Sequence, residues 1–142
     1  MKIKVLLVDD EEEFAETLAK RLELRGFRVT RAFSGKSALE LIKKIDFDVI
    51  ILDIMMPELS GNEALKEIKH IKPLTEIIML TGEATVENAI ESMKEGAFDF
   101  LMKPVETEIL TAKIKIAHKI KSEHENRIRE AEIGNILERR GW

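Results

Sequence analysis

The sequence contains no cysteine among its 142 residues. Disulfide bonds and thiolate metal sites are therefore excluded, and the three histidines, His70, His118 and His124, lack the spacing of metal ligands. No apolar run approaches the roughly 20 residues that span a bilayer, and the segment from Met1 to Lys4 is too short for a signal peptide. We therefore expect a cytoplasmic protein without a membrane anchor.

A basic surface is also absent, because the net charge at pH 7 is −4. The charge is uneven: the body up to Val105 carries −5 and the tail from Glu106 to Trp142 carries +1. An acidic body argues against direct binding to nucleic acid. The length and the 44% hydrophobic content fit one domain with a real core, plus an appendage.

Short apolar runs alternate with amphipathic segments along the chain. The runs predict strands over 4–8, 27–32, 49–52, 76–80 and 98–102. The amphipathic segments predict helices over 12–25, 34–45, 62–69, 85–95 and from 107 onward. Strands that alternate with helices of this length predict an α/β fold with a parallel sheet and right-handed crossovers.

Polar residues follow four of these apolar runs at the point where each strand is expected to end. They are Asp9 with Asp10, then Asp53, Thr81 and Lys103. The carboxyl ends of parallel strands lie on one edge of the sheet, where open α/β sheets bind ligands. We therefore expect three carboxylates, a hydroxyl and an ammonium to meet in one cleft.

This set of side chains suits a phosphoryl group and a divalent cation. Carboxylates that lie close together repel one another unless a cation neutralises them, and oxygen ligands favour a hard ion such as Mg²⁺. Asp53 follows the central run and is the natural nucleophile for an aspartyl phosphate. Lys103 and Thr81 would stabilise the transferred phosphoryl group.

In these residues the sequence resembles the receiver domain of two-component response regulators, the CheY-like family. The matching motifs are Asp9-Asp10, Asp53 to Gly61, Thr81-Gly82, and Gly96 to Pro104. The resemblance covers about residues 2–118. It implies a flavodoxin-like (βα)5 doubly wound sheet of strand order 2-1-3-4-5 and a histidine kinase as phosphodonor.

The resemblance also assigns roles to the site residues. Asp53 would be the phosphoacceptor, and Asp10, Asp53 and the Met55 carbonyl would bind Mg²⁺, with Asp9 acting through water. Thr81 and Phe100 would form a switch pair that reports phosphorylation. Two further family features are a cis peptide at Lys103-Pro104 and tuning of the phosphoryl lifetime by Met55 and Glu83.

The tail predicts more helix beyond the receiver. We divide the chain into a receiver domain at 1–120 and a helical C-terminal extension or linker at 121–142. Ile128, Ala131 and Ile136 restore an apolar stripe at helical spacing, whereas Gly134 weakens the helix. Two interpretations stay open: a frayed start of a linker, and a projecting helix that pairs with a second copy or a partner. A homodimer would use this helix or the face formed by the fourth helix, fifth strand and last helix.

The sequence therefore predicts a phosphorylation-activated switch that is a phosphoacceptor with slow autodephosphorylation, not an enzyme. One alternative is an interaction scaffold that works without phosphorylation. Another is the N-terminal receiver fragment of a longer transcription regulator. A metal-dependent phosphatase is disfavoured, because such enzymes carry two aspartates two positions apart after the first strand, where this chain has Asp9-Asp10-Glu11.

Overall fold

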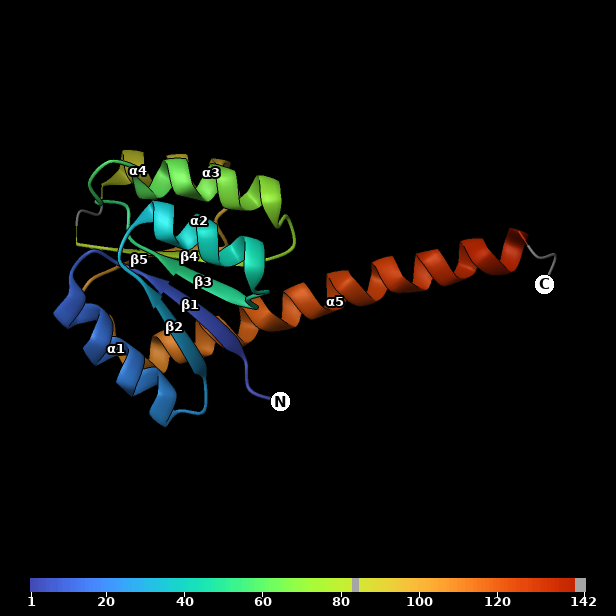
Figure 1. Cartoon of the computed structure of the whole chain (residues 1–142), viewed down its shortest axis with the longest axis horizontal. Coiled ribbons are helices and arrows are strands. Elements are labelled where there is room, and N and C mark those ends of the chain that lie inside the picture. Colours follow the sequence, from blue (N-terminus) through green and yellow to red (C-terminus); the bar gives the residue numbers. More distant parts are fainter. Residues whose placement is uncertain (83–84, 140–142) are drawn as a thin grey trace.

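The computed structural model describes residues 1–82 and 85–139, in which strands and helices alternate (Figure 1). The strands are β1 (Lys4–Val8), β2 (Arg28–Ala32), β3 (Val49–Leu52), β4 (Glu76–Thr81) and β5 (Asp99–Met102). The helices are α1 (Glu12–Leu24), α2 (Gly35–Lys44), α3 (Gly61–Ile71), α4 (Val86–Lys94) and α5 (Thr107–Arg139). The alternation expected from the sequence is confirmed, with boundaries that differ by one or two residues.

The five strands form one parallel sheet in the order β2-β1-β3-β4-β5. This order confirms the flavodoxin-like topology. β1 and β3 are continuous β-branched and leucine runs because helices cover both of their faces. All the strands point the same way, so their carboxyl ends share one edge of the sheet.

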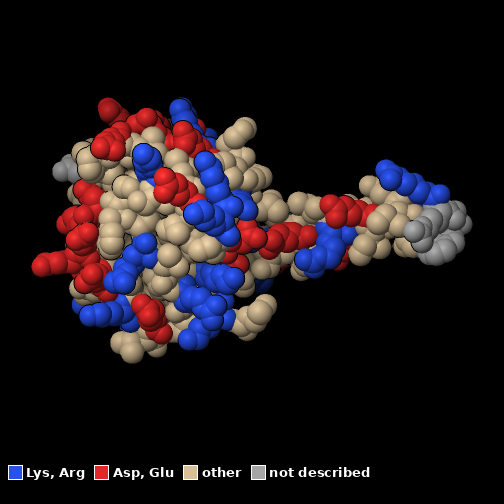
Figure 2. All heavy atoms as spheres, in the orientation of Figure 1, with Lys and Arg blue, Asp and Glu red and all other residues tan. Residues whose placement is uncertain are grey.

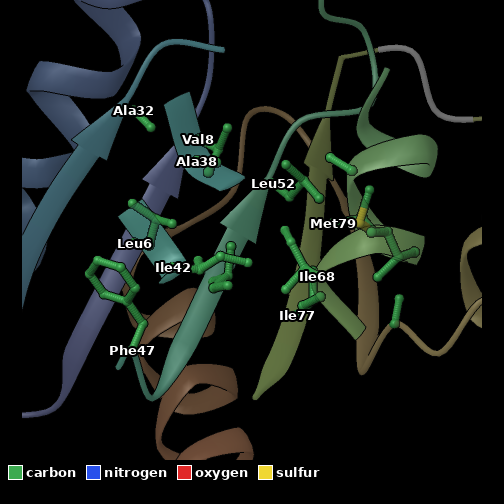
Figure 3. Close-up of a cluster of buried hydrophobic side chains, with 14 of the residues drawn as sticks. Leu6, Val8, Ala32, Ala38, Ile42, Phe47, Leu52, Ile68, Ile77 and Met79 are labelled. Carbon is green, nitrogen blue, oxygen red and sulfur yellow. The ribbon is translucent and has the colours of Figure 1, made fainter. Parts of the chain in front are cut away.

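Each face of the sheet packs against its own set of helices. One face is covered by α2 and α3 and contributes the cluster drawn in Figure 3, in which Ile42 and Ile68 meet Leu6, Leu52 and Met79. The other face is covered by α1 and α5, whose core residues include Leu18, Leu22, Leu110 and Ile114. These two cores fix the sheet and leave its carboxyl edge free for a site.

Side chains cap the starts of α2, α3 and α4. The hydroxyl oxygens of Ser34 and Thr85 accept amide hydrogen bonds at the starts of α2 and α4. Gly26 and Gly96 follow α1 and α4 with φ of 92° and 101°, a conformation that favours glycine at helix ends. Ser60 and Glu63 form a reciprocal capping box at the start of α3.

Helix α5 does not end with the body of the domain. It continues as one helix of 33 residues, and its second half projects from the body (Figure 1). Leu110, Ile114 and Ala117 are buried in the core on the face of the sheet that α1 and α5 cover, whereas Ile109 is exposed. Gly134 lies inside the helix, so the described part of the tail is a projecting helix and not a frayed segment.

The junction between the body and the projecting part of α5 is polar. The buried Lys121 ammonium lies 3.9 Å from Asp48 and 3.3 Å from Glu125. Asp48 also accepts the Lys4 amide at 2.8 Å, so the base of the projection is tied to the start of the sheet. No helix within residues 1–82 and 85–139 is long and apolar enough to cross a membrane.

We expect Gly61→Ala to destabilise the protein by about 1–3 kcal/mol, the usual cost of overpacking. A Cβ at Gly61 would overlap the Asp53 backbone oxygen and lie 2.6 Å from the Ile54 Cα. Urea unfolding measures the change. Gly134→Ala is the matched control: no atom lies within 4 Å of its added Cβ, so the extension should gain about 1 kcal/mol of helix stability. Equal stability of Gly61→Ala and the parent would contradict the close approach.

Candidate functional site

The predicted cluster lies at the carboxyl edge of the sheet. Asp9 and Asp10 follow β1, Asp53 follows β3, Thr81 ends β4, and Lys103 comes directly after β5. One carboxylate oxygen from each of the three aspartates lies within 4.8 Å of the others. Figure 2 shows acidic side chains gathered at this end of the body, away from the projecting helix.

The three carboxylates differ in their surroundings. Asp9 and Asp53 are buried, with 2% and 4% of their surfaces exposed, whereas Asp10 is exposed. The Glu11 amide donates to Asp9 Oδ1 at 2.9 Å, and the Met55 amide donates to Asp53 Oδ1 at 3.3 Å. Backbone amides therefore orient both buried carboxylates, and Asp10 completes the cluster from the solvent side.

Lys103 is the cation of the cluster. Its Nζ lies 2.7 Å from Asp9 Oδ2 and 3.6 Å from Asp53 Oδ2. Burial alone would lower the pKa of Lys103, but its hydrogen bonds to Asp9 and Glu11 and the charges of Asp9 and Asp53 outweigh burial and raise that pKa. Lys103 is therefore a firmly charged ammonium aimed between two buried carboxylates.

Burial also raises the pKa of Asp9, and the nearby charge of Asp53 acts in the same direction. The hydrogen bonds from Lys103 and the Glu11 amide oppose the rise without cancelling it. Two buried carboxylates share one ammonium, so the cluster carries unneutralised negative charge. Such a site attracts a further cation.

The site predicted from the sequence did not include two residues that contact Lys103, Glu11 and Phe14. Glu11 Oε1 accepts a hydrogen bond from Lys103 Nζ at 3.1 Å, and the same ammonium lies 4.2 Å from the centroid of the Phe14 ring. In the sequence Phe14 indicates only a core position of α1. Glu11 stands at the N-cap of α1, where glutamate is not a favoured capping residue, but this local feature does not indicate Lys103 as its partner.

The loop between β3 and α3 holds Met55 beside Asp53, with the Met55 side chain 55% exposed. The Gly61 amide donates to the Ile54 carbonyl at 2.9 Å and closes this loop. Thr81 is fully buried, and the half-buried Phe100 packs against the core on the α2 and α3 side. Met55 thus contacts Asp53 through its amide, and Thr81 ends β4, the strand next to β3.

The Lys103-Pro104 peptide is cis. The Lys103 amide donates to the Thr81 carbonyl at 2.9 Å, which links the ends of β4 and β5. Glu83, the second residue predicted to tune the site, lies outside the described residues.

The donor set fits a small hard cation. Carboxylate oxygens from three side chains converge within a few ångströms, and Mg²⁺ in proteins combines one or two carboxylates with water and phosphate oxygens. The Lys103 ammonium lies beside Asp9 and Asp53 of this set, so a bound cation and the ammonium would both attract an anionic group at Asp53. The arrangement can therefore hold a phosphoryl group next to a carboxylate nucleophile.

Comparisons with known proteins identify the family of this chain. A model of the response regulator receiver domain family matches residues 5–115. The Regulatory protein AtoC of Escherichia coli is 37% identical over 119 residues, which are 84% of this chain and 26% of AtoC. The chain therefore spans about a quarter of this curated relative.

Solved structures share the fold as well as the sequence pattern. A CheY-like response regulator receiver domain protein from Methanospirillum hungatei superposes with a TM-score of 0.84 at 30% identity, covering 87% of this chain and 99% of that one. A receiver domain described as BeF3-activated DrrB gives a TM-score of 0.77 at 31% identity, covering 84% and 99%. From its sequence, its sheet order and its acidic cluster, this chain belongs to the response regulator receiver domain family.

Proposed function

We propose that the chain is a phosphorylation-activated switch in which Asp53 accepts a phosphoryl group from a histidine kinase. A carboxylate oxygen of Asp53 attacks phosphorus, the new O–P bond forms, and the P–N bond breaks with its electron pair left on the histidine. One observation carries the proposal: Asp53 is buried, amide-oriented and 3.6 Å from a charged lysine. That setting suits a nucleophile whose product gains negative charge.

Asp10, Asp53 and the Met55 carbonyl would hold Mg²⁺ directly, with Asp9 acting through water. The convergent carboxylate oxygens support this assignment. Bound Mg²⁺ would neutralise charge on the phosphoryl oxygens. Asp9 also keeps the Lys103 ammonium in place through its 2.7 Å ion pair, and Lys103 would donate to a phosphoryl oxygen.

Thr81 and Phe100 would carry the signal away from the site. The buried Thr81 hydroxyl would move to the phosphoryl group, and the half-buried Phe100 ring would turn further inward. Their strands are direct neighbours, since Thr81 pairs with Met102 in the β4–β5 register. Two packed arrangements whose balance depends on the phosphoryl group are enough to explain a switch. Met55 and Glu83 would set how fast water removes the phosphoryl group.

The output would be self-association. With the receiver taken as 1–120, the extension at 121–142 offers one surface and the α4–β5–α5 face offers the other. Large apolar side chains are exposed on both: Ile90, Met93, Met102, Ile109 and Ile116 on the face, and Ile128, Ile133, Ile136 and Leu137 on the extension. AtoC is a regulatory protein about three times as long as this chain, and a role as the receiver part of a longer transcription regulator is the second candidate.

Phosphorylation with acetyl phosphate and Mg²⁺ tests the acceptor. We expect one phosphoryl adduct on the parent and none on Asp53→Ala. The other buried aspartate, Asp9, has one carboxylate oxygen bound by the Glu11 amide and the other paired with Lys103 at 2.7 Å, whereas Lys103 lies 3.6 Å from Asp53. Native mass spectrometry reads the adduct and the oligomeric state together. Asp46→Ala is the control and should keep the adduct. The Asp46 carboxylate pairs with Lys72 and lies far from the site. A parent that stays unmodified with acetyl phosphate and with histidine kinases would favour the phosphorylation-independent scaffold.

Mg²⁺ should raise the thermal stability of the parent. At ten times the dissociation constant the gain is about 1.4 kcal/mol, which corresponds to a melting temperature higher by roughly 5 °C for a chain of this size. Asp10→Asn removes the exposed carboxylate of the cluster and should abolish most of the shift. Glu12→Gln, which removes a charge from the first turn of α1, should retain it. An undiminished shift in Asp10→Asn would place the metal elsewhere.

Paired substitutions separate the two association surfaces. If the extension pairs, Ile133→Ser with Ile136→Ser should leave the phosphorylated protein monomeric in sedimentation velocity, because these changes remove apolar area from the helix. If the α4–β5–α5 face forms the dimer interface, Ile90→Ser with Met93→Ser should instead leave the phosphorylated protein monomeric. A phosphorylated parent that sediments as a monomer would contradict self-association and point to a separate partner protein.

A further inference from the structure

Glu11 occupies the N-cap position of α1, yet it does not cap the helix. Serine, threonine, aspartate and asparagine are favoured there because their short side chains reach the free amides. The Glu11 side chain makes no capping hydrogen bond. It reaches instead to Lys103, 92 positions away in the sequence, and accepts a hydrogen bond from the ammonium at 3.1 Å.

The Lys103 ammonium has three protons to donate. It lies 2.7 Å from Asp9 and 3.1 Å from Glu11, both within hydrogen-bond distance, but 3.6 Å from Asp53. The Phe14 ring supports another side of the ammonium at 4.2 Å. The ammonium thus hydrogen-bonds to Asp9 and Glu11 and lies slightly too far from the Asp53 carboxylate for a hydrogen bond.

The two hydrogen-bonded partners differ in how readily they can let the ammonium go. Asp9 is buried, and a buried carboxylate that loses its cation is strongly destabilised. The Glu11 side chain is 66% exposed, so its carboxylate can turn into water at little cost. Lys103 can therefore give up its hydrogen bond to Glu11 at a lower cost than its hydrogen bond to Asp9.

We propose that Glu11 is a positioning residue that holds the Lys103 ammonium in the unphosphorylated protein and yields it to a phosphoryl oxygen on Asp53. The inference rests on the proposed role of Asp53 as phosphoacceptor. The exchange replaces one N–H···O bond by another and transfers no proton, so Lys103 stays an ammonium and Glu11 a carboxylate. Because the existing ion pair must break, Glu11 lowers the affinity of the site for a phosphoryl group.

Beryllofluoride, a stable mimic of a phosphoryl group on a carboxylate, provides the test. Its dissociation constant is measured by calorimetry at Mg²⁺ concentrations that saturate each variant. Glu11→Gln should bind it roughly two- to fivefold more tightly than the parent, the factor expected when an exposed ion pair stops competing. A structural defect would weaken binding, so a gain in affinity separates positioning from damage.

Glu12→Gln is the matched control, because it removes the same charge one residue further along. Glu12 lies in the first turn of α1 and forms no ion pair within the described part of the chain. Its affinity for beryllofluoride should stay near that of the parent. Thermal unfolding without Mg²⁺ checks that both variants fold.

The outcomes distinguish this inference from the proposed function. A parent that fails to bind beryllofluoride with Mg²⁺ would overturn the acceptor role of Asp53 and the inference with it. A parent that binds, beside a Glu11→Gln variant of equal or weaker affinity, would overturn the positioning role alone. Equal gains in Glu11→Gln and Glu12→Gln would also overturn it, since the effect would then be general electrostatics.

Discussion

Two buried carboxylates that share one ammonium hold the carboxyl edge of the sheet together. Asp9 and Asp53 directly follow the adjacent strands β1 and β3 and repel each other, and burial makes that repulsion costly. Lys103 comes from the far edge strand and pairs with both. A buried pair of this kind adds little net stability, but losing one partner is expensive. The loops after β1 and β5 are therefore fixed relative to each other.

The loop after Asp53 and helix α4 differ in how firmly they are held. The loop after Asp53 is closed by the Gly61 amide and by the capping box at Ser60. In helix α4, by contrast, Ser92 is the only buried residue within Val86–Lys94. Its hydroxyl donates a 2.8 Å hydrogen bond to the Asn62 side chain. A rigid acceptor beside a lightly packed helix is the contrast that a switch needs, because a small change at the acceptor can then shift the helix.

The sequence was enough to predict the sheet and the meeting of Asp9, Asp10, Asp53 and Lys103 at its carboxyl edge. Apolar runs that end in aspartate, threonine and lysine leave few other arrangements once the strands are parallel. For α5 the sequence predicted helix, but it left open whether the segment after residue 120 is a frayed linker or a projecting helix, because Gly134 lowers local helix propensity. Glu11 escaped for a different reason: its contact with Lys103 spans 92 positions, and no local pattern encodes such a pair.

Packing against the body accounts for only part of the stability of the projecting part of α5. Apolar contact with the sheet ends at Ala117, and the polar junction at Lys121 is the last firm attachment. Beyond it the helix has its own backbone hydrogen bonds and exposed side chains, and lone helices of about this length are marginal in water. Ile128, Ile133 and Ile136 nevertheless face solvent along the projection. A helix with this composition gains most of its stability by burying those side chains against another surface, which is the physical reason to expect that the extension works in association.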